Sequence, residues 1–320
     1  MRRRDFLRVS SAMMAAMVLN PHGFAKQPEQ INQAWYRRSR RFVKLPVSRV
    51  AYVEHGRGPA ALFVHGYPLN GFQWRGALER LQAHRRCIAP DLMGMGFTET
   101  PQGQTISSAT QATMLAMLLD ALRIDTVDLV ANDSGGIAAQ LFLAKYPQRV
   151  RTLLLTNCDV DENSPPSDLL PAIEQAKKGT FVDQFIVPQL NNKNLAREAN
   201  GMGGQAYTNP ANLTDDLIEA YLRPLVKTPL KKAQVNQYLV SMETNLLVAI
   251  RKELRQWKGP ARMVWGLKDI LFGVEWAEWL DRTLPGSRGV RRVEGAKLFF
   301  PEEMPDLIAE EATRLWGVQP

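Results

Sequence analysis

Cysteine and histidine are scarce in this chain, which has two cysteines and four histidines among 320 residues. Two cysteines cannot build the disulfide framework of a small secreted scaffold. The chain also lacks the Cys and His spacings of zinc sites, the Walker loop that cradles nucleotide phosphates and the glycine-rich fingerprint of dinucleotide binding. The sequence therefore predicts neither a metal nor an organic cofactor.

A strong charge of one sign and a long apolar run are absent as well. The formal net charge is +8, but residues 1–25 contain four arginines and one aspartate, which leaves +5 for the rest of the chain. Such a mild excess does not indicate nucleic acid binding. The apolar stretch at residues 10–19 is shorter than the ~20 residues of an ordinary membrane span. We therefore expect no nucleic acid partner and no stable membrane span.

The first 25 residues carry the pattern of a targeting segment. Arg3-Arg4-Asp5-Phe6-Leu7-Arg8 matches the twin-arginine pattern, a short apolar stretch follows, and Gly23-Phe24-Ala25 offers a small-x-small cleavage site. We therefore expect residues 1–25 to be a signal peptide and residues 26–320 to form the mature domain. The partner during export would be the twin-arginine (Tat) translocase, and the destination would be the periplasm.

The order of predicted elements indicates one large α/β domain, for which 320 residues with 45% hydrophobic composition are sufficient. Strands and helices alternate up to residue 160 and again after residue 260. Between them, residues 161–256 combine helical patterns with Pro-, Asn- and Gly-rich turns, which indicates an inserted lid. The alternation predicts a mostly parallel sheet with helices on both faces and the active site at the strands' carboxyl ends. Expected strands are 42–45 and 50–54, which form an antiparallel hairpin, and 60–64, 127–131, 150–156, 261–265 and 289–293.

The most informative segment follows the strand at 127–131. Asn132-Asp133-Ser134-Gly135-Gly136 links that strand directly to a helix, so the turn would expose the side chain of Asp133. Small neighbouring residues let the backbone pass closely, as in a nucleophile elbow. A carboxylate there would attack sp3 carbon and form an ester. The alternative is a surface turn of common composition.

Further motifs occur in the same order as in a known superfamily. The strand at 60–64 ends in His65-Gly66-Tyr67-Pro68, and 87–96 reads CIAPDLMGMG before the elbow. From about residue 40 to 320 the chain resembles an α/β-hydrolase. An aspartate at the elbow together with His-Gly-x-Pro resembles its branch of haloalkane dehalogenases, haloacetate dehalogenases and epoxide hydrolases. This resemblance implies an eight-stranded sheet, Asp133 as nucleophile, and an oxyanion hole made by the amides of Tyr67 and Ser134, with His65 as scaffold.

The resemblance also implies a carboxylate that orients a catalytic histidine. Asp269 follows the strand at 261–265 in the family's Trp-Gly-x-x-Asp spacing and is the best match. Some dehalogenases take the acid from the strand after the elbow helix instead, and Asp159 is the counterpart there. For Asp159 the alternative of a loop or helix-capping residue is equally open.

The chain departs from the family where the histidine is expected. The family's stretch resembles Gly-Ala-Gly-His-Phe-Pro, whereas residues 295–301 read GAKLFFP, so the slot falls on Leu298. All four histidines precede the elbow. A general base commonly raises the rate of a reaction ~10² to 10⁴-fold, so its absence needs an explanation. Either another residue serves as base, or the reaction needs none, or the site binds a ligand without turnover. Titratable residues near the slot are Glu294, Lys297 and Glu302.

The expected function is hydrolysis of a carbon–halogen bond or an epoxide in a small organic substrate. The Trp and Asn residues that bind halide in dehalogenases are absent, because Tyr67 and Ser134 stand at those points. Lid tyrosines assist epoxide opening in the epoxide hydrolases, and here the candidates, which packing would explain equally well, are Tyr207, Tyr221 and Tyr238. The alternatives are a ligand-binding, non-hydrolytic member and a cofactor-free lyase or decarboxylase.

Overall fold

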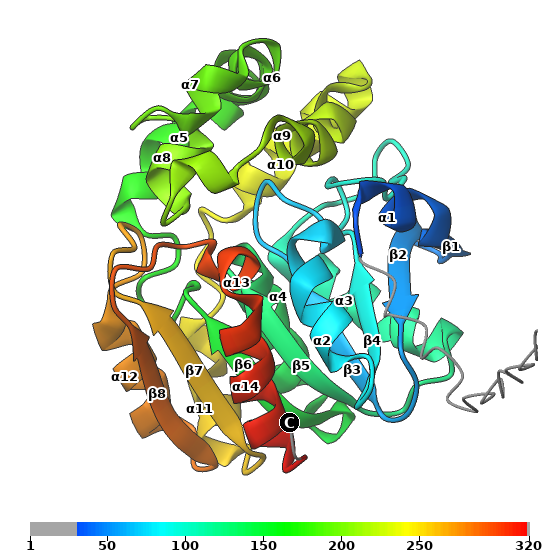
Figure 1. The fold of residues 1–320 in the computed structure, drawn as a ribbon, viewed down its shortest axis with the longest axis vertical. Coiled ribbons are helices and arrows are strands. Elements are labelled where there is room, and N and C mark those ends of the chain that lie inside the picture. Colours follow the sequence, from blue (N-terminus) through cyan, green and yellow to red (C-terminus); the bar gives the residue numbers. More distant parts are fainter. Residues whose placement is uncertain (1–30, 319–320) are drawn as a thin grey trace, which may run out of the picture.

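The computed structural model describes residues 31–318, so the predicted signal peptide lies outside the described residues. Eight strands form one sheet in the order β1-β2-β4-β3-β5-β6-β7-β8 (Figure 1). The pairs β1–β2 and β2–β4 are antiparallel, and every other neighbouring pair is parallel. The strands are β1 (Arg41–Lys44), β2 (Arg49–His55), β3 (Ala60–Val64), β4 (Arg86–Pro90), β5 (Val127–Asn132), β6 (Val150–Thr156), β7 (Ala261–Gly266) and β8 (Ser287–Val293).

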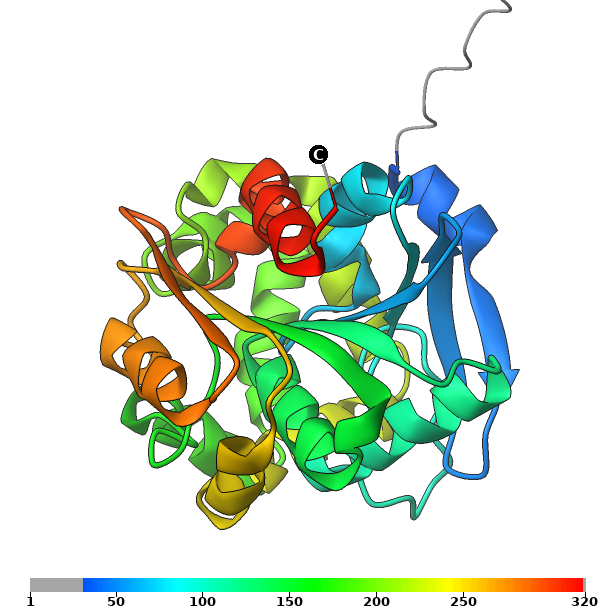
Figure 2. The same ribbon diagram turned by 90° about the horizontal axis from the view of Figure 1, so that it is seen from below.

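Helices cover both faces of this sheet. Figure 2 shows α2 and α14 on one face and α3, α4, α11 and α12 on the other. All six residues of the central strand β5 are buried, as expected of a parallel strand covered on both sides. The helices of this body are α1 (Gln33–Ser39), α2 (Arg75–Leu81), α3 (Ser108–Ala121), α4 (Ser134–Lys145), α11 (Arg251–Gln256), α12 (Val274–Thr283), α13 (Phe300–Glu303) and α14 (Pro305–Trp316).

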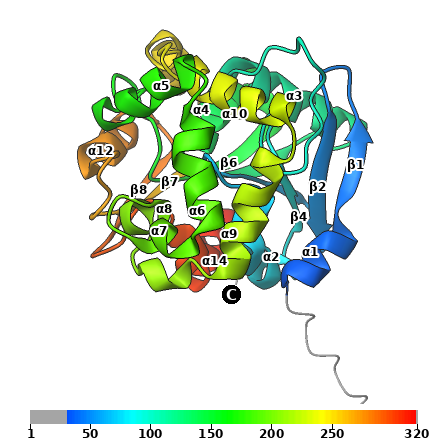
Figure 3. The ribbon, with the colours of Figure 1, turned by 90° about the horizontal axis from the view of Figure 1, so that it is seen from above.

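The chain between β6 and β7 forms the inserted helical region that the sequence predicts. Six of its α-helices stand above the carboxyl ends of the strands (Figures 1 and 3), and we call them the lid. The seventh, α11, packs against α4 and α12 and so belongs to the body. The lid helices are α5 (Leu170–Lys177), α6 (Val187–Asn191), α7 (Lys193–Arg197), α8 (Met202–Ala206), α9 (Asp215–Leu222) and α10 (Pro229–Ser241).

Short helical turns complete the connections between these elements. Six are 3₁₀ turns and η4 is a π-helical segment. They are η1 (Gly71–Trp74), η2 (Pro147–Arg149), η3 (Ser167–Leu169), η4 (Val182–Ile186), η5 (Pro210–Asn212), η6 (Arg223–Val226) and η7 (Val248–Ile250).

The fold class is therefore the one that the sequence predicts, including the opening hairpin. Cys87 on β4 and Cys158 just after β6 are buried and free, and β3 and β5 lie between their strands. Within residues 31–318, we find no helix with the length and apolar character that a membrane crossing requires.

Candidate active site

The turn after β5 has the geometry of a nucleophile elbow. Asp133 caps the N-terminus of α4 with φ 53° and ψ −137°, a backbone conformation that costs a non-glycine residue free energy. Its amide donates to the carbonyl of Asn157 at 2.7 Å, and its carbonyl accepts from the amide of Gly136 at 2.7 Å. These two bonds hold the strained residue between the end of β5 and the end of β6.

Three glycines allow the surrounding chains to close around Asp133. A Cβ at Gly66 would lie 2.5 Å from Asp133 Oδ2, and one at Gly135 would lie 2.5 Å from the carbonyl oxygen of His65. A Cβ at Gly136 would lie 2.4 Å from the Cβ of Cys158. Side chains at these positions would push the strands and the carboxyl apart, so the glycines are a steric condition of the elbow.

Both amides predicted for the oxyanion hole face the carboxyl of Asp133. The amide of Tyr67 donates to Oδ2 at 2.7 Å. Burial raises the pKa of Asp133 well above its usual range, and the negative charge of Asp159 raises it further, while hydrogen bonds from the amides of Tyr67 and Ser134 oppose the shift. The amides therefore stabilise the ionised form of an otherwise disfavoured carboxylate.

His65 is scaffold, as the sequence predicts. Its ring is fully buried, with Nδ1 2.9 Å from the carbonyl of Gly66 and Nε2 accepting from the amide of Leu92 at 2.9 Å. Burial lowers its pKa, which favours the neutral ring that these two bonds require. Both ring nitrogens are engaged in positioning the loop that carries Tyr67.

Asp269 lies in the loop after β7 and is held by a neighbour that sequence reasoning did not single out. Asn157 donates from Nδ2 to Asp269 Oδ2 at 2.8 Å, and the amide of Leu271 donates to Oδ1 at 2.9 Å. Burial raises the pKa of Asp269 to about 6, although these hydrogen bonds lower it by stabilising the ionised form. Asn157 also forms two hydrogen bonds with the backbone of Gly266: its Nδ2 donates to the carbonyl oxygen, and its Oδ1 accepts from the amide. The feature of the sequence that could have indicated Asn157 is its position as a polar residue directly after the buried strand β6.

Leu298, at the position where the family's histidine is expected, lines the same cavity as Asp269. Its carbonyl accepts from Nδ2 of Asn132 at 3.1 Å, which ties its loop to the end of β5. Leu298, Asp269 and Tyr67 line one cavity of about 460 Å³ beneath the lid, together with apolar residues such as Phe181. Asp133 is not among the residues that line this cavity; it is connected to it through Tyr67, whose amide donates to its carboxyl, and it is 7% exposed.

Asp159 lies just past β6, and its charge acts on the carboxyl of Asp133. Its side chain is buried, and Oδ1 has no hydrogen-bond partner among the described residues. Burial raises its pKa to about 7, while the hydroxyl of Ser164 and its own amide stabilise the charged form. Gln140 of α4 donates to its backbone carbonyl at 2.8 Å and fixes this segment. The structure thus places three carboxyl groups, those of Asp133, Asp159 and Asp269, at the same edge of the sheet.

Of the titratable residues near position 298 in sequence, Lys297 and Glu302 are bonded to other groups and Glu294 faces solvent. Lys297 donates from Nζ to the carbonyl of Gly204 at 2.5 Å. Glu302 accepts hydrogen bonds from three side chains of the lid and body. They are the hydroxyls of Tyr207, at 2.5 Å, and Tyr221, at 2.8 Å, and the guanidinium of Arg75.

Two of the three lid tyrosines are thus committed to Glu302, and Tyr238 of α10 is the one that faces the elbow. Its ring centroid lies 6.2 Å from that of Tyr67. Its hydroxyl and those of Ser134 and Ser108 face one another without forming a hydrogen bond of good geometry, and the hydroxyl of Tyr67 is also buried without a partner. Buried hydroxyls without partners next to a carboxyl indicate a place for water or for a polar substrate group.

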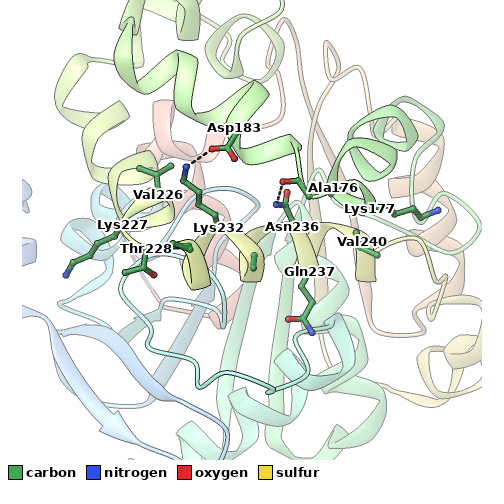
Figure 4. A pocket seen from close by; sticks show the side chains of 13 residues that line it. Ala176, Lys177, Asp183, Val226, Lys227, Thr228, Lys232, Asn236, Gln237 and Val240 are labelled. Atoms are coloured by element: carbon green, nitrogen blue, oxygen red, sulfur yellow. Dashed lines mark hydrogen bonds and ion pairs between the residues drawn. The ribbon is translucent and has the colours of Figure 1, made fainter.

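A larger groove of about 830 Å³ lies on the lid between α5 and α10. Figure 4 shows Lys232 of α10 reaching Asp183, at 2.5 Å, with Lys177 and Lys227 at its borders. No elbow residue lines it. In the part of the chain that the structure describes, no cluster of three His, Cys, Asp or Glu side chains could hold a metal ion.

Comparisons with known proteins agree with this architecture. Residues 59–303 match the family model described as alpha/beta hydrolase fold. A cis-3-alkyl-4-alkyloxetan-2-one decarboxylase of Shewanella oneidensis is 27% identical over 75% of this chain and 77% of its own length. Epoxide hydrolase 3 of Mus musculus is 26% identical over 82% and 72%. The solved haloalkane dehalogenase DbeA of Bradyrhizobium elkani superposes with a TM-score of 0.72 at 22% identity, covering 87% of this chain and 98% of that one.

Proposed function

The chain belongs to the α/β-hydrolase fold family, and on that premise we propose that its Asp133 carboxylate attacks an sp3 carbon of a small organic substrate. The attack opens an epoxide or displaces a halide and leaves an alkyl ester on Asp133. Water then cleaves this ester. The cavity of about 460 Å³ under the lid accommodates a small molecule.

One observation carries the proposal, namely the hydrogen bond from the amide of Tyr67 to Asp133 Oδ2. Because Oδ2 is held in the oxyanion hole, Oδ1 is the oxygen available for attack. In the ester, Oδ2 becomes the carbonyl oxygen and already lies against the donors that stabilise the charge developing there during hydrolysis. The nucleophile must be ionised, so ester formation should rise with pH as the carboxyl loses its proton.

The unpartnered phenol hydroxyls of Tyr67 and Tyr238 favour an epoxide over a halide. An opening epoxide produces an alkoxide, which needs a proton, whereas a leaving halide needs none. A phenol hydroxyl beside Asp133 can supply that proton in the same step.

A second candidate is favoured by Leu298 and by the decarboxylase relative. In a β-lactone, Asp133 would attack the ring carbon bonded to oxygen, break that C–O bond and release a carboxylate on the substrate. Loss of CO2 would then leave an electron pair that forms the alkene and expels Asp133 as a free carboxylate. Neither step consumes water or needs a base, so the absence of histidine would be no obstacle.

Intact-mass spectrometry after mixing with epoxides, haloalkanes, halogenated acids and β-lactones tests both candidates. We expect a transient mass increase in the wild type, which digestion and peptide mapping should place on the peptide that contains Asp133, and no adduct in Asp133→Asn. Diol, alcohol or halide as product supports hydrolysis, and alkene with CO2 supports decarboxylation. Failure of every reactive compound to modify Asp133, with tight reversible ligands instead, would point to a binding protein.

A further inference from the structure

Hydrolysis of an ester on Asp133 needs a base next to the elbow, and the described residues offer few. His65 is held by two backbone groups, and Glu302 is bonded to two tyrosines and an arginine. Lys297 is bonded to a lid carbonyl, and Glu294 is exposed. None of these groups has a free acceptor atom beside Asp133.

Asp159 does have such an atom. Its residue is 2% exposed, and Oδ1 is buried without a hydrogen-bond partner in the described part of the chain. A buried carboxylate oxygen without a partner is costly, so it usually binds a water or serves a function. The carboxyl lies close enough to Asp133 and Tyr238 for its charge to raise the pKa of both.

We propose that Asp159 is the general base that activates water against the Asp133 ester, in the role that a histidine has in related enzymes. The proposal rests on the hydrolytic function proposed above. It concerns only the second half-reaction, because Asp159 transfers no proton while Asp133 attacks the substrate.

Water cleaves the ester in two stages, and Asp159 carries a proton from the first stage to the second. Asp159 Oδ1 accepts a proton from water while the water oxygen bonds to Cγ of the ester, and the C=O electron pair moves to Oδ2, which faces the amide of Tyr67. The pair then returns, the bond from Cγ to the ester oxygen breaks, and Asp159 gives its proton to the departing alkoxide. Asp133, now a carboxylic acid, loses its proton to the phenolate left by epoxide opening or, after halide displacement, to solvent.

The electrostatic surroundings suit this role. Burial raises the pKa of Asp159 to about 7, and a base with a pKa near the working pH is most effective. The groups that face it are the carboxyls of Asp133 and Asp269, the hydroxyl of Ser164 on its own loop and the phenol of Tyr238 on α10. No cation is among them in residues 31–318.

The test separates formation of the adduct from its decay. Asp159→Asn should form the Asp133 adduct at least as fast as the wild type, because the charge of Asp159 raises the pKa of Asp133, whereas the adduct should decay at least ~100-fold more slowly. Glu294→Gln is the control, since it removes an exposed carboxyl that is near Leu298 in sequence, and its adduct should decay at the wild-type rate.

A rescue gives independent support. Adding Leu298→His to Asp159→Asn places an imidazole in the cavity that Asp269 lines and should recover part of the turnover. The gain need not be large, because Asn157 already bonds Asp269 and the pocket is packed around leucine.

Two results would overturn different claims. Unchanged adduct decay in Asp159→Asn would refute Asp159 as base and leave the nucleophile proposal standing, whereas a wild type that never forms the adduct would refute the nucleophile itself. If the variant does not fold, the pH dependence of adduct decay in the wild type decides. Decay should accelerate as pH rises through about 7, and a flat profile from pH 5 to 8 would contradict the proposal.

Discussion

At the scale of single residues, the site concentrates free-energy costs that a purely structural turn would avoid. Asp133 has a positive φ, and of the three carboxyl groups at this edge of the sheet those of Asp133 and Asp159 are buried and that of Asp269 is partly buried. Burial is the first cause of the raised pKa of Asp159, Asp269 and Asp133 alike. Strain and unfavourable burial that coincide at one place are typical of functional sites.

The cost of burying Asp159 predicts how stability depends on pH. Its pKa is about 7 in the folded protein against an ordinary value of 3.8. Between these values the folded protein keeps a proton that the unfolded chain releases, so this residue lowers stability progressively as pH rises from about 4 to 7. Asp159→Asn should therefore gain stability relative to the wild type over that window, by up to about 4 kcal/mol, at about 1.4 kcal/mol per pKa unit.

Urea unfolding at pH 4.5, 6 and 8 measures this difference. Asp125→Asn is the control, because Asp125 is exposed and its replacement should leave the curve parallel to that of the wild type. A curve for Asp159→Asn that also stays parallel would mean that the carboxyl is not desolvated as the structure implies.

At the scale of secondary-structure elements, most strands and the inserted lid could be predicted because each depends on local patterns. Apolar runs ended by turns marked β3, β5, β6 and β7. The assignment of α11 to the body could not be predicted, since it depends on which helices it contacts rather than on its sequence.

The residues of the site also differ in whether the sequence alone could predict their surroundings. Asp133, Asp269 and Leu298 follow from spacing relative to strands. The environment of Asp159 does not, because its neighbours come from the elbow, α4 and α10, which are up to about eighty residues away along the chain. Glu302 was singled out as a possible base, whereas the structure gives it lid tyrosines as partners, and no local pattern announces that contact.

The hydrogen bonds of Glu302 on α13 lead us to expect that this residue fastens the lid to the body. It joins Tyr207 after α8, Tyr221 on α9 and Arg75 on α2, and its side chain is 2% exposed. Glu302→Gln removes the charge and leaves Arg75 uncompensated, so we expect a loss of about 2 to 3 kcal/mol in the free energy of unfolding. Amide hydrogen exchange should accelerate most in α8 and α9.

Arg80→Gln provides the matched comparison for this change. Arg80 pairs with Asp306 on the neighbouring α14, but the side chain of Asp306 is 85% exposed, so its loss should cost at most about 1 kcal/mol. Equal effects of the two substitutions, or exchange in Glu302→Gln that is unchanged in α8 and α9, would show that Glu302 does not fasten the lid.

At the scale of the whole molecule, the topology bears on the proposed export. The sheet places β3 between β4 and β5, and the chain returns from the lid to the body at α11 and β7. The elbow therefore exists only when distant segments have come together. Pairing of this kind is complete only in the folded protein. A route that carries folded proteins fits a site assembled in this way, and the pattern at Arg3 and Arg4 resembles the twin-arginine signal for such a route.

We therefore expect Arg3→Lys combined with Arg4→Lys to keep the protein in the cytoplasm, because the translocase recognises the arginine pair rather than positive charge alone. The control is Arg37→Lys combined with Arg38→Lys, which makes the same chemical change in the arginine pair of α1 and should leave export intact. Fractionation followed by immunoblotting measures both variants, and the cytoplasmic protein should still form the Asp133 adduct, since folding precedes export. Recovery of the first variant from the periplasm at the wild-type level would refute the targeting proposal without affecting the assignment of the active site.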